Sequence, residues 1–600
     1  MELTAFSPRR LFTRLIVVVT MCASALAQDR EQTFADVFPK GCIAYASVRD
    51  FPALKSSFDG SPFGRFFADP GFKATFEALT RKWEEQADSE AEKVLSKLRD
   101  SLDLIQGEIA VALLEVDKDS ETPDFAAALL INVGDKTDEF ARIVEELFDE
   151  IVKEGKAILK HDDLDGVPMI RMLEKPEEGE EVDDQEVQFA ASNGVACLVV
   201  AAGSAAQDNH LGRLLRQAAD QEGESLRQDP AFTETALATC VAQVEMYLHV
   251  GTLAQLGRDQ MEAEPEDGEV LEPGSEDPGP EGFNPEEAFN PEAMGLLSFG
   301  AVTFQGGLDL SGGSVSAELK WSEVKPLQQI LSALFSGSDT VSFASWVPAD
   351  AKSFTSIAAD LKALLDLSLS FSKTEESGIP PPVSEAFKIL NGQLAFFVSS
   401  VPPEEGLPIP QMPEPLNFAL FLGVHDSKAA DAFVTEMLRP MGLHAARRRE
   451  EFLGFQVYHL PVGGFINVHY AVLEECVLAS LSDTLIKDVL RRKSNPELES
   501  LLGSGNVKTA IERLQSGSTS FTYSESRMAM LQFVLQLAQG IKEIPGLEEG
   551  QIELPPLETL KEIVNKYFNG AIVGVQRVDE KGLRLRGQWQ EPVAVTQDDE

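Results

Sequence analysis

The chain has 600 residues, of which 98 are acidic and 51 are basic, so its formal net charge is −47. This surplus of carboxylates argues against binding to nucleic acid, which requires Lys and Arg side chains to neutralise the phosphates. A chain of this length suffices for several domains of about 150 residues, and with 43% hydrophobic residues it can form substantial cores.

Residues 1–27 have the features of a secretory signal peptide. Three arginines precede the apolar run 15–25, and residues 25–27, Ala-Leu-Ala, have the small-x-small pattern of a cleavage site. The run is shorter than the about 20 apolar residues that a membrane span needs. We therefore predict a mature chain that starts at Gln28, is exported to the periplasm, the cell surface or the medium, and has no transmembrane span. A retained N-terminal anchor is the alternative.

The segment 34–39, Phe-Ala-Asp-Val-Phe-Pro, returns at 343–348 as Phe-Ala-Ser-Trp-Val-Pro. Further matched pairs follow in the same order along the chain: Leu54 and Leu364, Gly107 and Gly392, Val133 and Val424, Gly166 and Gly454, Cys197 and Cys476, Gly300 and Gly570, and Trp321 and Trp589. Ordered self-similarity of this kind indicates a tandem duplication. We predict a first repeat at 28–336, a second at 337–595 and an acidic tail at 596–600.

Within the first repeat, the patterns predict strands and helices in alternation. Strands are expected at 43–48, 108–114, 125–133 and near 157, 167, 187 and 195, with a closing hairpin at 300–321. Helices are expected from 51, most strongly at 72–104, and at 137–153 and 206–219. Asp165-Gly166 and Asn193-Gly194 are typical of tight hairpin turns, because both dipeptides favour positive φ. The expected fold class is α+β, a duplicated domain with a mainly antiparallel sheet and interleaved helices.

The acidic stretch 260–294 lies inside the first repeat and is predicted to be disordered. No Lys or Arg occurs between Arg258 and Lys320, and the stretch has little apolar surface to offset its ordering entropy. Its short echo of Phe-Asn-Pro-Glu at 283–286 and 289–292 leaves a partner-binding motif as an alternative.

Four cysteines remain after residue 27: Cys42, Cys197, Cys240 and Cys476. No pair has C-x-x-C spacing, so they do not indicate a disulfide scaffold. Cys197 and Cys476 occupy equivalent apolar runs, where Cys usually acts as a small buried hydrophobe. One bridge among the first three cysteines stays open in an oxidising compartment.

No strong catalytic or nucleotide-binding motif occurs in the chain. The acidic segment His161 to Gly166 superficially resembles a calcium loop, but Met172 stands where a bidentate Glu is needed. The corresponding turn in the second repeat, 451–454, keeps the glycine and loses most of the carboxylates. We therefore interpret the segment as a hairpin turn.

His459 and His469 flank the turn Gly463-Gly464, which can bring both imidazoles onto neighbouring strands. Two histidines can begin a zinc site, but three protein ligands are the usual minimum. No third ligand is evident from the sequence. We predict no catalytic, cofactor-binding or metal-binding residues, and we interpret both histidines as satisfied or surface residues.

The exported start, the F-A-x-x-x-P segments ending at Pro39 and Pro348, and the order of elements resemble large secreted bacterial proteins of an uncharacterised domain family. This resemblance implies no activity and no catalytic residues. The leading hypothesis is an exported, non-enzymatic envelope protein with a binding or scaffolding role towards an unknown protein or envelope component. The alternative is a secreted hydrolase whose site is assembled from distant residues.

Overall fold

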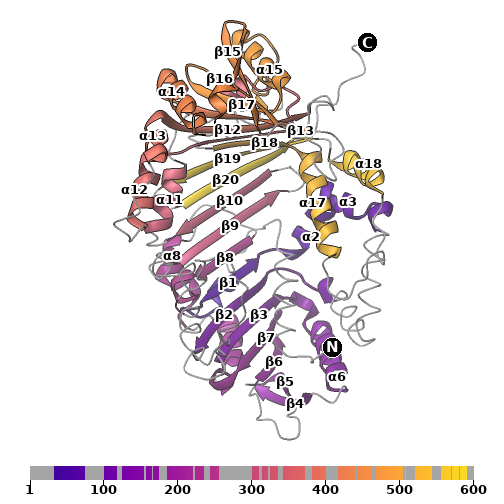
Figure 1. Ribbon diagram of the computed structural model, residues 1–600. Helices are drawn as coiled ribbons and strands as arrows, with labels where there is room; N and C mark the ends of the chain where they lie inside the picture. The colour runs from indigo at the N-terminus through magenta and orange to yellow at the C-terminus, as the bar shows by residue number, and fades with distance from the viewer. Residues whose placement is uncertain are drawn as a thin grey trace, which may run out of the picture. The chain divides into compact units, whose positions relative to one another are not determined.

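The chain is described by a computed structural model (Figure 1). The described residues are 33–73, 101–117, 124–153, 157–164, 166–174, 185–207, 209–220, 223–235, 244–253, 255, 301–309, 314–321, 325–335, 342–371, 381–400, 416–440, 442–462, 466–504, 507–508, 520–542, 556–568, 570–579 and 582–590. The predicted signal peptide, the acidic stretch 260–294, the acidic tail and most of the predicted helix 72–104 lie outside them.

The chain forms two compact units. Unit 1 comprises Met1–Gly64, Phe76–Ser311 and Ala317–Lys325, and unit 2 comprises Arg65–Thr75, Gly312–Ser316 and Pro326–Glu600. Both combine helices with an antiparallel sheet, as the α+β prediction requires. In the described part of the chain, no helix is both long enough and apolar enough to span a bilayer.

Unit 1 is built on one sheet. Its strands are β1 (Ala44–Val48), β2 (Ile109–Asp117), β3 (Asp124–Asn132), β4 (Ala157–Leu164), β5 (Val167–Glu174), β6 (Gln185–Ser192), β7 (Val195–Ala202), β8 (Val244–His249), β9 (Ala301–Asp309) and β10 (Ser314–Trp321). Their order across the sheet is β10, β9, β8, β1, β2, β3, β7, β6, β5, β4, and the neighbours from β9 to β4 are antiparallel.

Several helices of unit 1 bury apolar side chains against the strands of this sheet. The helices of the unit are η1 (Phe34–Asp36), α2 (Phe51–Gly60), α6 (Thr137–Lys153), η2 (Gly134–Lys136), η3 (Gly203–Gln207), α7 (His210–Asp220), η4 (Leu226–Gln228) and α8 (Pro230–Thr235), with α3 (Pro62–Phe67) at the boundary with unit 2. Helix α6 has the predicted bounds, and it buries Phe140, Phe148 and Ile151 in one cluster with Phe189 of β6. Helical spacing of these apolar residues puts them on one face.

Unit 2 has the same strand order. Its strands are β11 (Ser353–Ala358), β12 (Leu390–Ser400), β13 (Leu416–Val424), β14 (Arg448–Phe452), β15 (Phe455–Val462), β16 (Ile466–Val472), β17 (Cys476–Ser480), β18 (Ser520–Glu525), β19 (Ala571–Asp579) and β20 (Gly582–Gln590). Across the sheet they run β20, β19, β18, β11, β12, β13, β17, β16, β15, β14, all antiparallel. Strand β11 thus takes the place of β1, and each later strand that of its counterpart.

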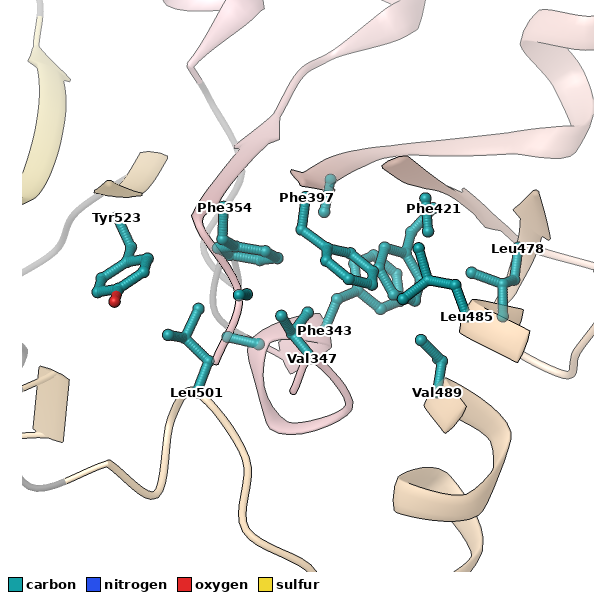
Figure 2. Close-up of a cluster of buried hydrophobic side chains, with 14 of the residues drawn as sticks. Phe343, Val347, Phe354, Phe397, Phe421, Leu478, Leu485, Val489, Leu501 and Tyr523 are labelled. Atoms are coloured by element: carbon teal, nitrogen blue, oxygen red, sulfur yellow. The ribbon is translucent and has the colours of Figure 1, made fainter. Parts of the chain in front are cut away.

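Helices are interleaved with the strands along unit 2, as they are along unit 1. They are α11 (Lys325–Leu334), η6 (Ser342–Ser345), α12 (Leu361–Phe371), α13 (Pro381–Ile389), α14 (Ser427–Leu438), η7 (Leu443–Ala445), α15 (Asp483–Ser494), α17 (Ser526–Lys542) and α18 (Leu557–Tyr567). In Figure 2, Phe343 and Val347 from the segment 343–348 lie among side chains of the sheet and of α15.

The F-A-x-x-x-P segments have a structural role in both units. Phe34 and Ala35 are buried in the core of unit 1, and Phe343 and Ala344 are buried in the core of unit 2. The prolines at the ends of the segments form isolated antiparallel bridges, Pro39 with Ser225 and Pro348 with Ser500. Burial of the apolar side chains in both cores therefore explains why the same residue types recur in the two segments.

Tight turns in both units need positive φ. Gly166 has φ 87° and Gly454 has φ 84°, each between the strands of an antiparallel hairpin. Asn193 and Gly194 have φ 51° and 84°, as the dipeptide predicts. Leu453 has φ 51° as well, a conformation that costs an ordinary side chain about 1–2 kcal/mol.

We expect Leu453→Asn to stabilise the protein by about 1 kcal/mol, because Asn tolerates this left-handed conformation and the pair then matches Asn193-Gly194. Leu453 is 57% exposed, so little packing is lost. Chemical denaturation checks this, with Leu453→Ala as a control that should stay within about 0.5 kcal/mol of the wild type. An unchanged or lowered stability of the Asn variant would contradict the expectation.

The described cysteines are unpaired and buried. Cys42, Cys197 and Cys476 are free thiols, so Cys42 and Cys197 form no bridge with one another, and Cys240 lies outside the described residues. Cys197 lies on β7, which pairs with β3, and Cys476 lies on β17, which pairs with β13. Burial raises the pKa of Cys42 and Cys476 to about 12, so these thiols behave as small hydrophobes.

One segment of unit 2 comes from near the start of the chain. Phe66 and Phe72 are buried, and the ring of Phe66 lies 5.5 Å from that of Phe568, which follows α18. Asp69 accepts hydrogen bonds from Lys566 Nζ (2.9 Å) and the Tyr567 hydroxyl (2.8 Å). Burial would raise the pKa of Asp69, but these hydrogen bonds outweigh it and lower the pKa.

Candidate metal centre

The hairpin of β15 and β16 places two histidines side by side. Its register sets His459 directly opposite His469, and Tyr458 opposite Tyr470. Because side chains alternate along a strand, the two pairs face opposite sides of the sheet. The tyrosines stack on each other at 4.9 Å and pack in a cluster with Leu438 of α14. The histidines face α15 instead.

Helix α15 supplies the third group. Its N-cap, Ser482, accepts a hydrogen bond from the backbone N–H of Leu485, which fixes the start of the helix. Asp483 is therefore the first helical residue, and its Oδ1 lies 3.9 Å from His459 Nδ1. Three potential ligand atoms, one each from His459, His469 and Asp483, all lie within 4.8 Å of one another.

One carboxylate oxygen of this group has no hydrogen-bond partner. Asp483 Oδ1 is shielded from solvent and accepts no hydrogen bond, which is costly for a carboxylate oxygen. Its other oxygen, Oδ2, accepts from Lys487 Nζ at 2.6 Å. The unpartnered oxygen on the side of the imidazoles is what a cation bound between the three residues would satisfy.

The two imidazoles are close enough to share one proton. His459 Nδ1 and His469 Nδ1 are 2.7 Å apart, the length of an N–H···N hydrogen bond that needs one proton. Two nitrogens bound to a tetrahedral zinc ion at about 2.0–2.1 Å are about 3.4 Å apart. Metal binding therefore requires loss of this proton and a separation of the rings by less than about 1 Å, which side-chain rotation can supply.

Glu450 on β14 orients the first imidazole. His459 Nε2 lies 3.2 Å from Glu450 Oε2, so this nitrogen can donate to the carboxylate while Nδ1 is left to bind a metal. A carboxylate behind a ligand histidine is the usual arrangement of zinc sites. Glu450 also accepts from Lys487 Nζ at 3.0 Å. Burial would lower the pKa of Lys487, but its hydrogen bonds to Asp483 and Glu450 raise it.

Unit 1 has no imidazole pair at the corresponding place. Arg171 on β5 stands opposite Gln188 on β6, in the positions that His459 and His469 take in unit 2. The guanidinium of Arg171 donates to Glu186 Oε2 at 2.7 Å and to Asp162 Oδ2 at 3.5 Å. A fixed cation thus fills this place in unit 1, so the candidate metal centre belongs to unit 2.

The acidic segment at 161–166 is a hairpin turn, as predicted. The backbone N–H of Gly166 donates to Asp163 Oδ1 at 2.8 Å, and Asp162 is paired with Arg171. His161 Nδ1 lies 4.0 Å from Glu145 Oε1 on α6, so these groups do not converge on one point. Asp165 lies outside the described residues.

A small cavity lies in unit 1. The cavity of about 160 Å³ has a mainly apolar lining that includes Leu164, Val167, Val195 and Leu215, with Arg216 at its wall. Among the described residues, those that line it include no carboxylate, cysteine or histidine.

Asp483 is the residue that sequence reasoning missed. No third ligand for His459 and His469 is evident from the sequence, and the structure places Asp483 beside both. The only local signal is the Ser482-Asp483 start of a helix, which says nothing about its neighbours in space.

Comparisons with known proteins identify no relative: no protein-family model, no curated protein and no solved structure matches the chain. The resemblance to secreted bacterial proteins of an uncharacterised family stays a prediction.

Proposed function

We propose that the protein is an exported, non-enzymatic binding protein whose unit 2 holds one divalent transition-metal ion, of the zinc class, at His459, His469 and Asp483. The observation that carries this proposal is the convergence of three ligand atoms within 4.8 Å, one of them from a carboxylate whose Oδ1 is shielded and accepts no hydrogen bond. Two imidazoles and a carboxylate suit zinc better than calcium or magnesium, which prefer oxygen ligands. The predicted signal peptide supports export.

Three protein ligands leave one coordination position open, as in zinc sites that also bind water or another molecule. In a binding or scaffolding protein, that position can accept a side chain of an envelope partner. The same open position also favours the alternative function, a secreted metal-dependent hydrolase in which the ion activates a bound water.

We also propose that the two units arose by tandem duplication. The proposal is supported by the shared strand order and by the similar surroundings of the two F-A-x-x-x-P segments. After duplication the β5–β6 and β15–β16 hairpins diverged, so that one carries an arginine and the other an imidazole pair. Metal binding is therefore proposed as a property of one copy alone.

We expect the full mature chain, freed of metal with a chelator, to bind one Zn²⁺ at this site in calorimetric titrations. Each of His459→Ala, His469→Ala and Asp483→Asn should weaken this binding by more than about 100-fold, because loss of a direct ligand exceeds the 10–100-fold effect of losing an outer-shell partner.

His425→Ala and His444→Ala are matched controls, because both histidines are exposed residues of unit 2 and should leave the binding unchanged. If the double variant His459→Ala, His469→Ala binds Zn²⁺ with wild-type affinity, the proposed site is wrong. Hydrolysis of simple ester or peptide substrates by the zinc-loaded wild type, but not by His469→Ala, would favour the hydrolase instead.

A further inference from the structure

Lys487 places a positive charge beside the candidate metal centre. Its ammonium lies 2.6 Å from Asp483 Oδ2 and 3.0 Å from both oxygens of Glu450. Its side chain is 18% exposed, so the interaction is partly shielded from solvent. Lys487 and Asp483 are four residues apart on α15, a spacing that puts both on the same face of the helix.

We propose that Lys487 is a built-in competitor that regulates the site: its ammonium takes the place of a metal ion on Asp483 and Glu450, and so keeps the metal weakly held and exchangeable. This inference rests on the proposed function, because it concerns the affinity of the same site. It assigns the site to reversible binding of a transition-metal ion, and not to a permanent structural ion.

Two effects of Lys487 oppose each other, and their sizes decide the sign. The ammonium repels an incoming divalent cation, and this repulsion is strong because the two charges would lie only a few ångströms apart in a place partly shielded from solvent. The ammonium also holds the carboxylate of Asp483 in place, which saves the entropy of ordering this side chain, a small saving because the side chain is short. Repulsion is the larger effect, so removal of the charge should tighten metal binding.

At the corresponding place in unit 1, a positively charged side chain of the protein also pairs with two carboxylates. There the internal cation is Arg171, which stands on the strand itself and binds Glu186 and Asp162. Asp162 on β4 and Glu450 on β14 lie at the same step of their hairpins, each four residues before the turn glycine. In unit 2 the cation comes from a helix side chain with rotatable bonds, which can leave when a metal arrives.

The test compares Zn²⁺ affinities of the full mature chain and three variants. Lys487→Met removes the charge and keeps the length of the side chain, and it should tighten Zn²⁺ binding about tenfold or more, equivalent to about 1.4 kcal/mol. Lys487→Arg keeps the charge and should stay within about threefold of the wild type. Lys493→Met is the matched control on α15, because Lys493 pairs with Glu475 and should leave the affinity unchanged.

The outcomes separate this inference from the proposed function. If the wild type binds Zn²⁺ at the site and Lys487→Met binds it equally or more weakly, Lys487 is a support for Asp483 and the inference is overturned while the proposed function stands. If neither protein binds Zn²⁺, both fall. If Lys487→Met alone binds measurably, and His469→Ala in that background abolishes binding, the inhibitory role of Lys487 is supported and the proposed function, which requires binding by the wild type, is overturned.

Discussion

Replacement of Phe66 with alanine is expected to destabilise unit 2 by about 3–5 kcal/mol, the usual cost of truncating a fully buried Phe. Phe66 is completely buried, and its ring lies 4.5 Å from that of Phe72 and 5.5 Å from that of Phe568. Although this residue precedes most of unit 1 in the chain, its ring contacts Phe568 near the C-terminus. The cavity left behind would lie beside Phe568, which follows α18.

Hydrogen exchange of the full chain checks this expectation, because it reports protection element by element. Phe66→Ala should lower protection in α17 and α18 and leave β3 and β7 of unit 1 unchanged. Phe58→Ala is the control, since Phe58 lies on α2 of unit 1 and is 36% exposed. Loss of protection in unit 1 with unchanged α17 and α18 would show that Phe66 supports the N-terminal part instead.

Replacement of Glu108 with glutamine is expected to stabilise the protein by about 3 kcal/mol at pH 8 and above. Glu108 is buried, and its carboxylate accepts hydrogen bonds from the Phe34 N–H (2.8 Å) and the Tyr45 hydroxyl (3.2 Å). Burial raises the pKa of Glu108 from 4.5 to about 7, despite these bonds and the nearby Arg49. Glutamine keeps an acceptor for Phe34 and removes the buried charge.

The sign follows from proton binding. Because the pKa is higher in the folded state than in the unfolded state, the folded state binds more protons between pH 4.5 and about 7. Stability of the wild type should therefore fall as the pH rises through this interval and stay low above it. A pKa difference of about 2.5 corresponds to about 3 kcal/mol. The segment of unit 2 that matches Gly107-Glu108 is Gly392-Gln393, so unit 2 has a neutral side chain at the position of Glu108.

Unfolding of both proteins by urea between pH 4.5 and 9 checks this. The wild type and Glu108→Gln should have similar stabilities near pH 4.5 and diverge above it. Glu139→Gln removes an equal charge from α6, where the side chain is 47% exposed, and should change stability by less than about 0.5 kcal/mol. If Glu108→Gln is the less stable protein at pH 8, the carboxylate is worth more as an acceptor than its burial costs.

The amino-acid sequence by itself determined the local elements of this protein. The bounds of α6 follow from the spacing of its apolar residues, and the turns at Gly166 and Asn193-Gly194 follow from the residues that tolerate positive φ. The four strands β4 to β7 were predicted for the same reason. These features depend on neighbours within a few residues, and such interactions can be read along the chain.

The tertiary structure alone decided which distant residues meet. Asp483 joins His459 and His469 because β17 returns beside β16 and directs α15 across the hairpin, a placement set by burial of Leu485 and Val489 in the core. The placement of Phe66 among the helices of unit 2 and the burial of Glu108 have the same origin. Apolar burial is non-directional, so sequence pattern predicts that these elements pack but not against which partner.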